Sequence, residues 1–217
     1  ITAADITYGE DLFVLISAGA DVGVGVKLDD VAESVIYFVQ IVNGSGNCTF
    51  SNVNSGLHTV TVSFPGDDDY AETVVSKNVT VNRAASTIEI SNYTIDYGKA
   101  ASITIVKTGA TGVNATFVEN PNIDVTISDN AISFNGDVNA GNYTLKVTTI
   151  VDGNHNAVTK TANVTVNKAP TEIVLANETL YLKAYDVVSD VAKLIPSDAG
   201  DLTFLSSDED IALAYES

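Results

Sequence analysis

The stretch KNVTVNRAASTIEISNYT (Lys77–Thr94) decides the fold, because the chain nearly repeats it 85 residues later as ANVTVNKAPTEIVLANET (Ala162–Thr179). The five residues NVTVN are identical in the two copies, and at the same offset residues 55–84 align without a gap to residues 140–169. A period of this length is that of a whole small domain, since solenoid repeats have units of roughly 20–50 residues. The repeated stretch therefore predicts the last strand of one domain, a short linker and the first strand of the next.

Alternating apolar and polar residues predict that each repeat is built from strands. The pattern is clear in HTVTVSF (58–64), YTLKVTT (143–149) and both copies of NVTVN, and it is rich in Val, Thr and Tyr. This is typical of half-buried strands. The closest approach to a helical pattern is residues 27–40, but their SVIYFV portion (34–39) favours a strand. Many short strands separated by Gly- and Asn-rich turns predict an all-β protein of tandem immunoglobulin-like β-sandwich domains.

One tyrosine marks a corner of the predicted sandwich. Tyr143 begins the penultimate strand of the second repeat directly after a glycine turn, and His58 occupies the same position in the first repeat. In immunoglobulin-like sandwiches a tyrosine at this position bonds through its hydroxyl to nearby backbone. The chain has one cysteine, Cys48, and no Trp, so the core lacks the antibody-type disulfide and tryptophan.

A family resemblance rests on these motifs. The chain resembles the bacterial and archaeal immunoglobulin-like (Big-type) repeats of cell-surface adhesins, such as those of methanogenic archaea. The motifs that carry this resemblance are the YG turn, AG-[YH]-T with its SGLHT counterpart, GDDDY, and NVTVN followed by Arg or Lys. It covers residues 1 to about 169 as two repeats. The sequence departs from the pattern in two places. VDGNHN (151–156) replaces GDDDY in the second repeat, and the first repeat lacks the opening strand that the second repeat has at 87–90.

The expected domains are residues 1–84, with the first strand missing, residues 85–169, and residues 170–217. The third segment contains PSDAG and SSD motifs that are similar to a second group of immunoglobulin-like domains. It is short for a complete sandwich, so we expect a partial domain. Two explanations stay open: a longer chain, or strands donated by a neighbouring subunit to an open sheet edge.

The charge balance excludes several partners. The chain carries 28 acidic and 10 basic residues, for a net charge of -18. Nucleic acid binding requires clustered Lys and Arg, so we expect no nucleic acid partner. No apolar run reaches the roughly 18 residues of a membrane-spanning helix, so we expect no membrane insertion in this segment.

Asparagine-linked glycosylation motifs are unusually frequent. Random placement of the Asn, Ser and Thr residues predicts about 3.5 such triplets, and the chain has more than twice as many. An exposed, glycosylated surface follows if these motifs are used. Alternating Asn and Thr on polar strand faces is the simpler explanation of the same pattern. The candidate glycosylation residues are Asn43, Asn47, Asn78, Asn92, Asn114, Asn142, Asn163 and Asn177.

The acidic turn GDDDY offers one candidate metal site. Asp67, Asp68 and Asp69 could supply oxygen ligands to Ca²⁺, although their spacing does not match the twelve-residue calcium loop, and a solvated hairpin turn is the default interpretation. We expect no other cofactor. The two histidines, His58 and His155, lie in separate repeats, and no nucleophile or phosphate-binding motif is present, so we expect no catalysis.

These features predict a non-catalytic stalk or spacer segment of an extracellular, cell-surface adhesin-like protein. The linkers at 82–86 and 167–171 are short, so neighbouring domains of the chain should be partners with little freedom. An unknown cell-surface ligand is a further expected partner. Two alternatives stay open: a subunit of an extracellular filament or surface layer that self-associates by strand exchange, and a spacer module of a secreted enzyme.

Overall fold

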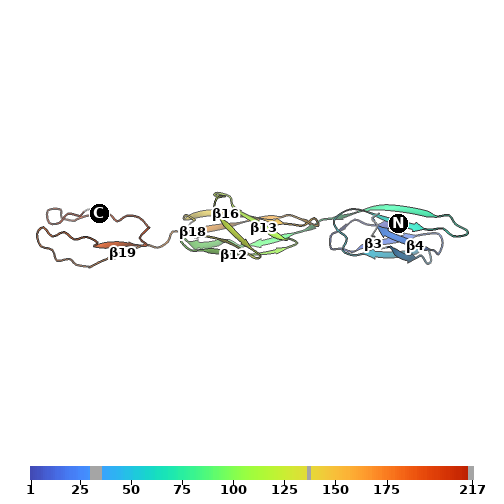
Figure 1. Cartoon of the computed structure of the whole chain (residues 1–217), viewed down its shortest axis with the longest axis horizontal. Coiled ribbons are helices and arrows are strands. Elements are labelled where there is room, and N and C mark those ends of the chain that lie inside the picture. Colours follow the sequence, from blue (N-terminus) through green and yellow to red (C-terminus); the bar gives the residue numbers. More distant parts are fainter. Residues whose placement is uncertain (30–35, 136–137, 215–217) are drawn as a thin grey trace. The chain divides into compact units, whose positions relative to one another are not determined.

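The computed structural model describes residues 1–29, 36–135 and 138–214, and all its regular elements in these ranges are strands (Figure 1). The chain divides into two compact units, Ile1–Val166 and Asn167–Ser217. The first unit contains two separate hydrophobic cores, each enclosed by two sheets. We call the two-sheet bodies around these cores sandwich 1 and sandwich 2.

Sandwich 1 has a three-stranded sheet in the order β1-β3-β6 and a five-stranded sheet in the order β2-β8-β7-β4-β5. In immunoglobulin lettering these are strands A, B and E facing strands A′, G, F, C and C′, which is the arrangement with an added C′ strand. The strands are β1 (Thr2–Ala3), β2 (Ile6–Thr7), β3 (Leu12–Ser17), β4 (Gly23–Leu28), β5 (Tyr37–Gln40), β6 (Ser45–Phe50), β7 (Gly56–Phe64) and β8 (Thr73–Asn82).

Sandwich 2 has two four-stranded sheets, in the orders β10-β12-β15-β14 and β11-β18-β16-β13. These correspond to strands A, B, E and D facing strands A′, G, F and C. The strands are β10 (Thr87–Ile90), β11 (Tyr93–Asp96), β12 (Ala101–Thr108), β13 (Gly112–Phe117), β14 (Val125–Ser128), β15 (Ala131–Phe134), β16 (Gly141–Ile150) and β18 (Thr159–Asn167). The protein is therefore all-β, with tandem immunoglobulin-like sandwiches as the sequence predicts.

The strand registers confirm the repeat. β7 pairs with β8 from Gly56↔Val81, and β16 pairs with β18 from Gly141↔Val166, which is the same register at an offset of 85. In the alternating runs of both hairpins Val60, Val79 and Leu145 are buried, and Phe64 and Tyr143 are half-buried. The period-2 pattern places these side chains in the core because successive residues of a strand face opposite sides.

The opening strand of sandwich 1 is shortened rather than missing. β1 has two residues and pairs antiparallel with β3 through Thr2↔Leu15, whereas β10 in the same place of sandwich 2 has four residues and pairs with β12. The strand expected at residues 34–39 is found as β5, and positions 34 and 35 lie outside the described residues.

The second unit contains one antiparallel pair, β19 (Glu172–Leu175) with β20 (Ala192–Ile195). β19 follows the linker as β10 does, with Glu172 aligned to Thr87 at the offset of 85, and each pairs antiparallel with the next long strand of its segment. None of the described residues from 167 to 214 is buried. Large apolar side chains such as Tyr181, Tyr185 and Val187 are more than 90% exposed.

Candidate functional site

The linker between the two sandwiches is hydrogen-bonded along its length. β8 ends at Asn82 and β10 begins at Thr87, and between them the two-residue strand β9 (Ala84–Ala85) pairs in parallel with β17 (His155–Asn156). The amide of Ala84 donates to the carbonyl of Asn154 (2.9 Å). The linker is therefore a strand on the surface of sandwich 2 and not a free connection.

The turn opposite this linker has a fixed shape. We call residues Asp152–Asn156 the junction turn. Asp152 Oδ1 accepts from the amide of Asn154 (2.8 Å) and from Nδ1 of His155 (2.8 Å). These bonds lower the pKa of the Asp152 carboxyl, with the His155 bond as the largest cause, so the carboxylate stays charged and holds the turn. Gly109 lies so close to the His155 ring that a Cβ there would meet Cδ2 at 2.6 Å.

Side chains of the junction turn reach sandwich 1. Asn154 Oδ1 accepts from the amide of Ser55 (2.7 Å), and Asn154 Nδ2 donates to Asn54 Oδ1 (3.0 Å). The hydroxyl of Ser55 donates to the carbonyl of Gly153 (2.8 Å). The His155 ring packs edge-on against Tyr8, with centroids 5.3 Å apart and planes at 76°. The linker and the junction turn together form a two-point connection, which is the candidate functional site.

Sequence reasoning did not find this site. Asn54 and Asn154 are 100 residues apart, and neither the alternation of the strands nor a motif brings them together. The available signal was the place where VDGNHN departs from the acidic GDDDY pattern, because that segment is the junction turn. The linker expected at 82–86 spans the end of β8 to the start of β10, and it pairs with this turn through β9.

The predicted corner is confirmed in sandwich 2. The hydroxyl of Tyr143 donates to the carbonyl of Asn139 (2.8 Å). In sandwich 1 the equivalent bond runs from Nε2 of His58 to the carbonyl of Asn54 (2.7 Å), and because a carbonyl only accepts, this nitrogen carries the hydrogen. The same bond therefore fixes the backbone of Asn54, one of the residues that the junction turn contacts.

The candidate calcium residues form a compact hydrogen-bonded turn. Asp67 Oδ1 accepts from the amides of Asp69 (2.9 Å) and Tyr70 (2.7 Å), and all three aspartates are exposed. Across residues 1–29, 36–135 and 138–214, no three His, Cys, Asp or Glu side chains are grouped as they would be to hold a metal ion. Calcium binding by Asp67, Asp68 and Asp69 stays a prediction.

All eight candidate glycosylation residues are exposed. In sandwich 2, Asn114, Asn142 and Asn163 lie on strands β13, β16 and β18 of one sheet. In sandwich 1, Asn78 lies on β8 of the corresponding sheet, where its Oδ1 accepts from the hydroxyl of Thr59 (3.1 Å). The remaining four residues are Asn43, Asn47, Asn92 and Asn177.

The groups with reactive side chains are occupied by structural contacts. His58 bonds to Asp29 (2.7 Å) and to backbone, and His155 bonds to Asp152. Cys48 is buried in the core of sandwich 1, and this burial raises the pKa of its thiol, which keeps it in the unreactive neutral form.

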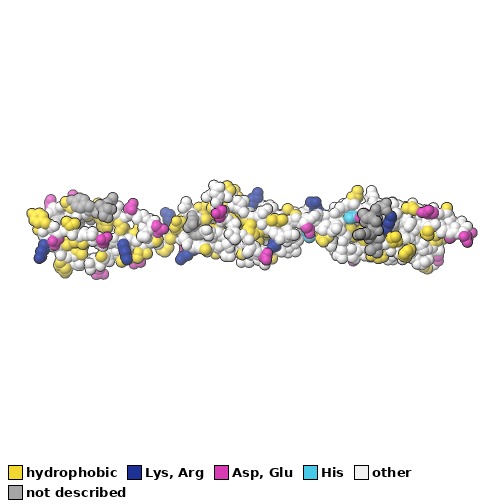
Figure 2. Space-filling view, viewed as in Figure 1, with side chains coloured by type: hydrophobic (Ala, Val, Ile, Leu, Met, Phe, Trp, Pro, Cys, Tyr) yellow, Lys and Arg dark blue, Asp and Glu magenta, His cyan; other side chains and the backbone are white. Residues whose placement is uncertain are grey.

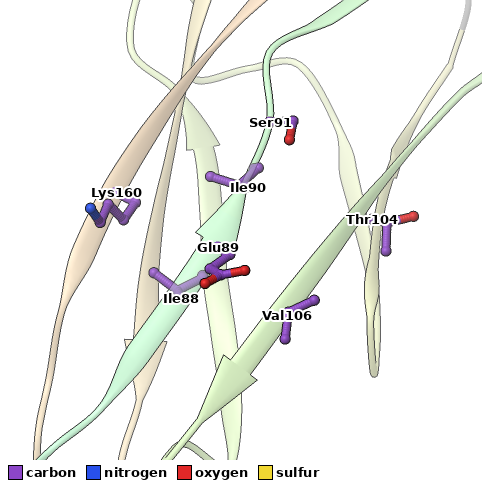
Figure 3. A pocket seen from close by; sticks show the side chains of 7 residues that line it. All are labelled: Ile88, Glu89, Ile90, Ser91, Thr104, Val106 and Lys160. Atoms are coloured by element: carbon purple, nitrogen blue, oxygen red, sulfur yellow. The ribbon is translucent and has the colours of Figure 1, made fainter.

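A shallow groove of about 420 Å³ lies beside β10 in sandwich 2. Figure 3 shows Glu89 and its neighbours on β10 between Lys160 on one side and Val106 with Thr104 on the other. Its lining combines one carboxylate, one amine and two hydroxyl groups with apolar side chains. The lining residues are Ile88, Glu89, Ile90, Ser91, Thr104, Val106 and Lys160.

On the face that Figure 2 shows, acidic and basic side chains are spread along the chain among polar and hydrophobic ones. No helix in the part of the chain that the structure describes has the length and apolar content needed to cross a lipid bilayer.

No protein-family model matches the chain, and no curated protein matches it in sequence. Among solved structures it is similar to the titin domains Z1Z2 in complex with telethonin, with 11% identity, 77% of this chain and 93% of that chain covered, and a TM-score of 0.43. It is also similar to fibronectin(III)-like modules of CbhA from Clostridium thermocellum (10% identity, 76% and 90% covered, TM-score 0.33). A third similar structure is the Ig1-2 module of the Drosophila receptor protein tyrosine phosphatase DLAR (11% identity, 76% and 95% covered, TM-score 0.32).

Proposed function

We propose that the chain is a non-catalytic spacer segment of a cell-surface adhesin-like protein, in which the junction sets the position of one sandwich relative to the next. A spacer needs modules that are folded independently of any ligand and connections that resist bending. The two closed cores supply the first property, and the linker pairing with the junction turn supplies the second.

The observation that carries this proposal is the two-point connection. A flexible linker would leave each sandwich free to reorient, because short unpaired linkers still sample many conformations. Here the linker strand β9 pairs with β17. Separately from this pairing, Asn154 contacts Ser55 and His155 contacts Tyr8. Bending at the linker would have to break these contacts together.

Residual dipolar couplings of the intact chain test this directly. We expect the amides of sandwich 1 and sandwich 2 to fit one alignment tensor. Inserting Gly-Ser-Gly between Arg83 and Ala84 should split the fit into two tensors while leaving each sandwich folded. An insertion of the same three residues after Asn122, in a loop of sandwich 2, is the matched control. Two independent tensors in the unmodified chain would refute a rigid spacer.

We further propose that the protein is extracellular and glycosylated, in line with its resemblance to archaeal adhesin repeats. The exposure of all eight candidate asparagines supports this proposal, because a buried acceptor could not carry a glycan. Glycopeptide mass spectrometry of the chain from its natural source tests it. Complete absence of glycan at these residues, or antibodies that label only permeabilised cells, would count against an extracellular location.

A second candidate function is a filament subunit assembled by strand donation. The observation in its favour is the second unit, where a two-stranded sheet leaves Ile173, Leu175 and Ile195 exposed. Two-stranded sheets are marginal on their own and pair readily with an added strand. Electron microscopy of the purified chain separates the two functions: polymers with a regular repeat favour the filament, and monomers favour the spacer.

A further inference from the structure

Both histidines of the chain lie at the connection between the two sandwiches, and each faces an aspartate. His58 Nδ1 lies 2.7 Å from Asp29 Oδ2 in sandwich 1, and His155 Nδ1 lies 2.8 Å from Asp152 Oδ1 in the junction turn. Histidine is the side chain that ordinarily changes its charge between about pH 5 and pH 8. Histidine titration therefore changes the charge of this chain only at the two-point connection.

The His58 ring stands between two groups that only accept hydrogen bonds. Its Nε2 lies 2.7 Å from the carbonyl oxygen of Asn54, and its Nδ1 faces the Asp29 carboxylate. A neutral imidazole has one N–H group and satisfies one of these acceptors, whereas the charged imidazolium has two and satisfies both. The side chain of His58 is 14% exposed, so water has little room to replace either bond. The geometry therefore fits the charged ring.

A single peptide group joins His58 to the junction turn. The carbonyl of Asn54 and the amide of Ser55 belong to the same peptide unit. The carbonyl accepts from the His58 ring, and the amide donates to Asn154 Oδ1 at 2.7 Å. Each bond in such a chain polarises the next, so a positive charge on the ring strengthens the bond between the Ser55 amide and Asn154. The charge of His58 is thereby felt on the surface of sandwich 2.

The residues that correspond to His58 in position or in type do not share this dependence. His155 donates through Nδ1 to Asp152, and a neutral imidazole can carry its hydrogen on that nitrogen, so this bond is available in both charge states. In sandwich 2 the position of His58 is taken by Tyr143, whose neutral hydroxyl donates the corner bond. A response of the connection to pH is therefore expected from His58.

Other charged side chains surround the two rings without titrating in the same range. Lysine, arginine and glutamate ordinarily keep their charge between about pH 5 and pH 8. Their fields are therefore the same before and after a histidine changes its charge. These residues are Lys27 on β4, Lys77 on β8, Glu10 after the YG turn, Arg83 in the linker and Lys107 on β12.

We propose that acid strengthens the connection between the two sandwiches, with His58 as the titrating group. In acid the charged ring donates to Asp29 and to Asn54 together. When the ring loses a proton, it keeps the bond to the carboxylate, because hydrogen bonds to ionised groups are the stronger ones. Nε2 then faces the Asn54 carbonyl without a hydrogen, and the peptide that holds Asn154 is released on one side. This inference rests on the proposed spacer function, since it concerns regulation of the same connection.

Solvent exchange of the Ser55 amide in the intact chain, measured by NMR, tests the proposal. The protection factor removes the intrinsic effect of pH on exchange, and we expect it to be several-fold higher at about pH 5.5 than at about pH 8. Nitrogen-15 shifts of the His58 ring report its hydrogens in the same samples. Both ring nitrogens should carry hydrogen in acid, and Nδ1 alone at the higher pH.

Asp29→Asn is the decisive variant, because it supplies the donor that a neutral ring lacks. Asp29 Oδ1 accepts from the amide of Thr59 at 2.9 Å, and Oδ2 faces the ring. In the variant the amide oxygen keeps the Thr59 bond, and the amide nitrogen donates to Nδ1 of a neutral His58, whose Nε2 retains its hydrogen for Asn54. Position 29 has φ 57, a conformation that asparagine tolerates. The protection of Ser55 should then no longer depend on pH.

His155→Phe is the matched control, because it keeps an aromatic ring beside Tyr8 and removes the other histidine. The pH dependence of Ser55 protection should persist in it. Protection that is equal at both pH values in the natural chain, or that falls in Asp29→Asn as it does in the natural chain, overturns the proposal. Dipolar couplings at about pH 5.5 separate this failure from that of the spacer function. Two alignment tensors in acid refute the rigid spacer, whereas one tensor with pH-independent Ser55 protection refutes only the strengthening by acid.

Discussion

Side-chain carboxylates fasten the same pair of strands in both sandwiches. In sandwich 1, Asp29 Oδ1 accepts from the amide of Thr59 (2.9 Å). In sandwich 2, Glu119 accepts from the amide of Thr144 (2.6 Å) and from its hydroxyl (2.7 Å). Thr59 and Thr144 are equivalent in the repeat. In each sandwich a carboxylate just after the C strand (β4 or β13) therefore accepts a hydrogen bond from the F strand (β7 or β16). The residue differs, Asp or Glu, but the bond to backbone is kept.

The hydrogen bonds of Glu119 predict that sandwich 2 loses stability in acid. The bonds from the Thr144 amide and hydroxyl lower the pKa of the Glu119 carboxyl below its ordinary value of 4.5. Stability from a lowered pKa is fully present above the unfolded value and is lost as the pH falls through the lower folded value. Glu119→Gln should therefore be less stable than the natural protein near pH 7, and this difference in unfolding free energy should shrink as the pH falls below the unfolded pKa of about 4.3 and through the lower folded value.

Hydrogen exchange of the Thr144 amide, measured across this pH range, reports the effect locally. Glu89→Gln serves as the control, since Glu89 is an exposed carboxylate on β10. If the difference in Thr144 amide protection between Glu119→Gln and the natural protein stays constant with pH, the stabilising role of the Glu119 carboxylate is contradicted.

At the scale of elements, the sequence predicted strands better than it predicted contacts between them. Val60, Val79 and Leu145 were placed correctly because alternation reports which face of a strand is buried. The pairing of β9 with β17 was not predicted, because each has only two residues and no alternation can be seen over that length. The contact of Asn154 with Asn54 depends on the completed fold of both sandwiches. Local patterns carry no information about such a contact.

The turn between β12 and β13 offers a test of how the junction turn is supported. Gly109 has φ +64, a conformation that costs a residue with a Cβ roughly 1–2 kcal/mol. Its Cβ would also meet the His155 ring, at 2.6 Å from Cδ2. Gly109→Ala should therefore destabilise sandwich 2 and move His155 away from Tyr8, which would change the ring-current shifts of both rings in NMR spectra.

Gly98→Ala separates the two effects of that substitution. Gly98 has φ +80, but a Cβ there would have no heavy atom within 4 Å. Gly98→Ala should lower the stability of sandwich 2 through the strained backbone conformation and leave the His155 and Tyr8 resonances unchanged. Identical spectral changes in the two variants would show that Gly109 does not support the junction turn.

At the scale of the whole chain, folding free energy is distributed unevenly between the two units. Sandwich 1 and sandwich 2 each bury a core of aliphatic and aromatic side chains, with Leu12 and Phe117 fully enclosed. The second unit buries none of its described residues, so it gains little from the hydrophobic effect, which is the dominant favourable term in folding. The net charge of -18 adds repulsion that such a segment cannot offset by burial.

Hydrogen exchange should reveal this difference in the intact chain. We expect amides of β19 and β20 to exchange close to the unprotected rate, because a two-stranded sheet without a core opens at almost no free-energy cost. Amides of β16 and β18, which flank the core of sandwich 2, should be protected by close to the full stability of that domain. Strong protection of Ile173 and Leu194 in dilute monomer would contradict this expectation. Protection that appears only in polymerised material would mean that an added strand completes the sheet, which is the result that strand donation requires and the spacer function does not.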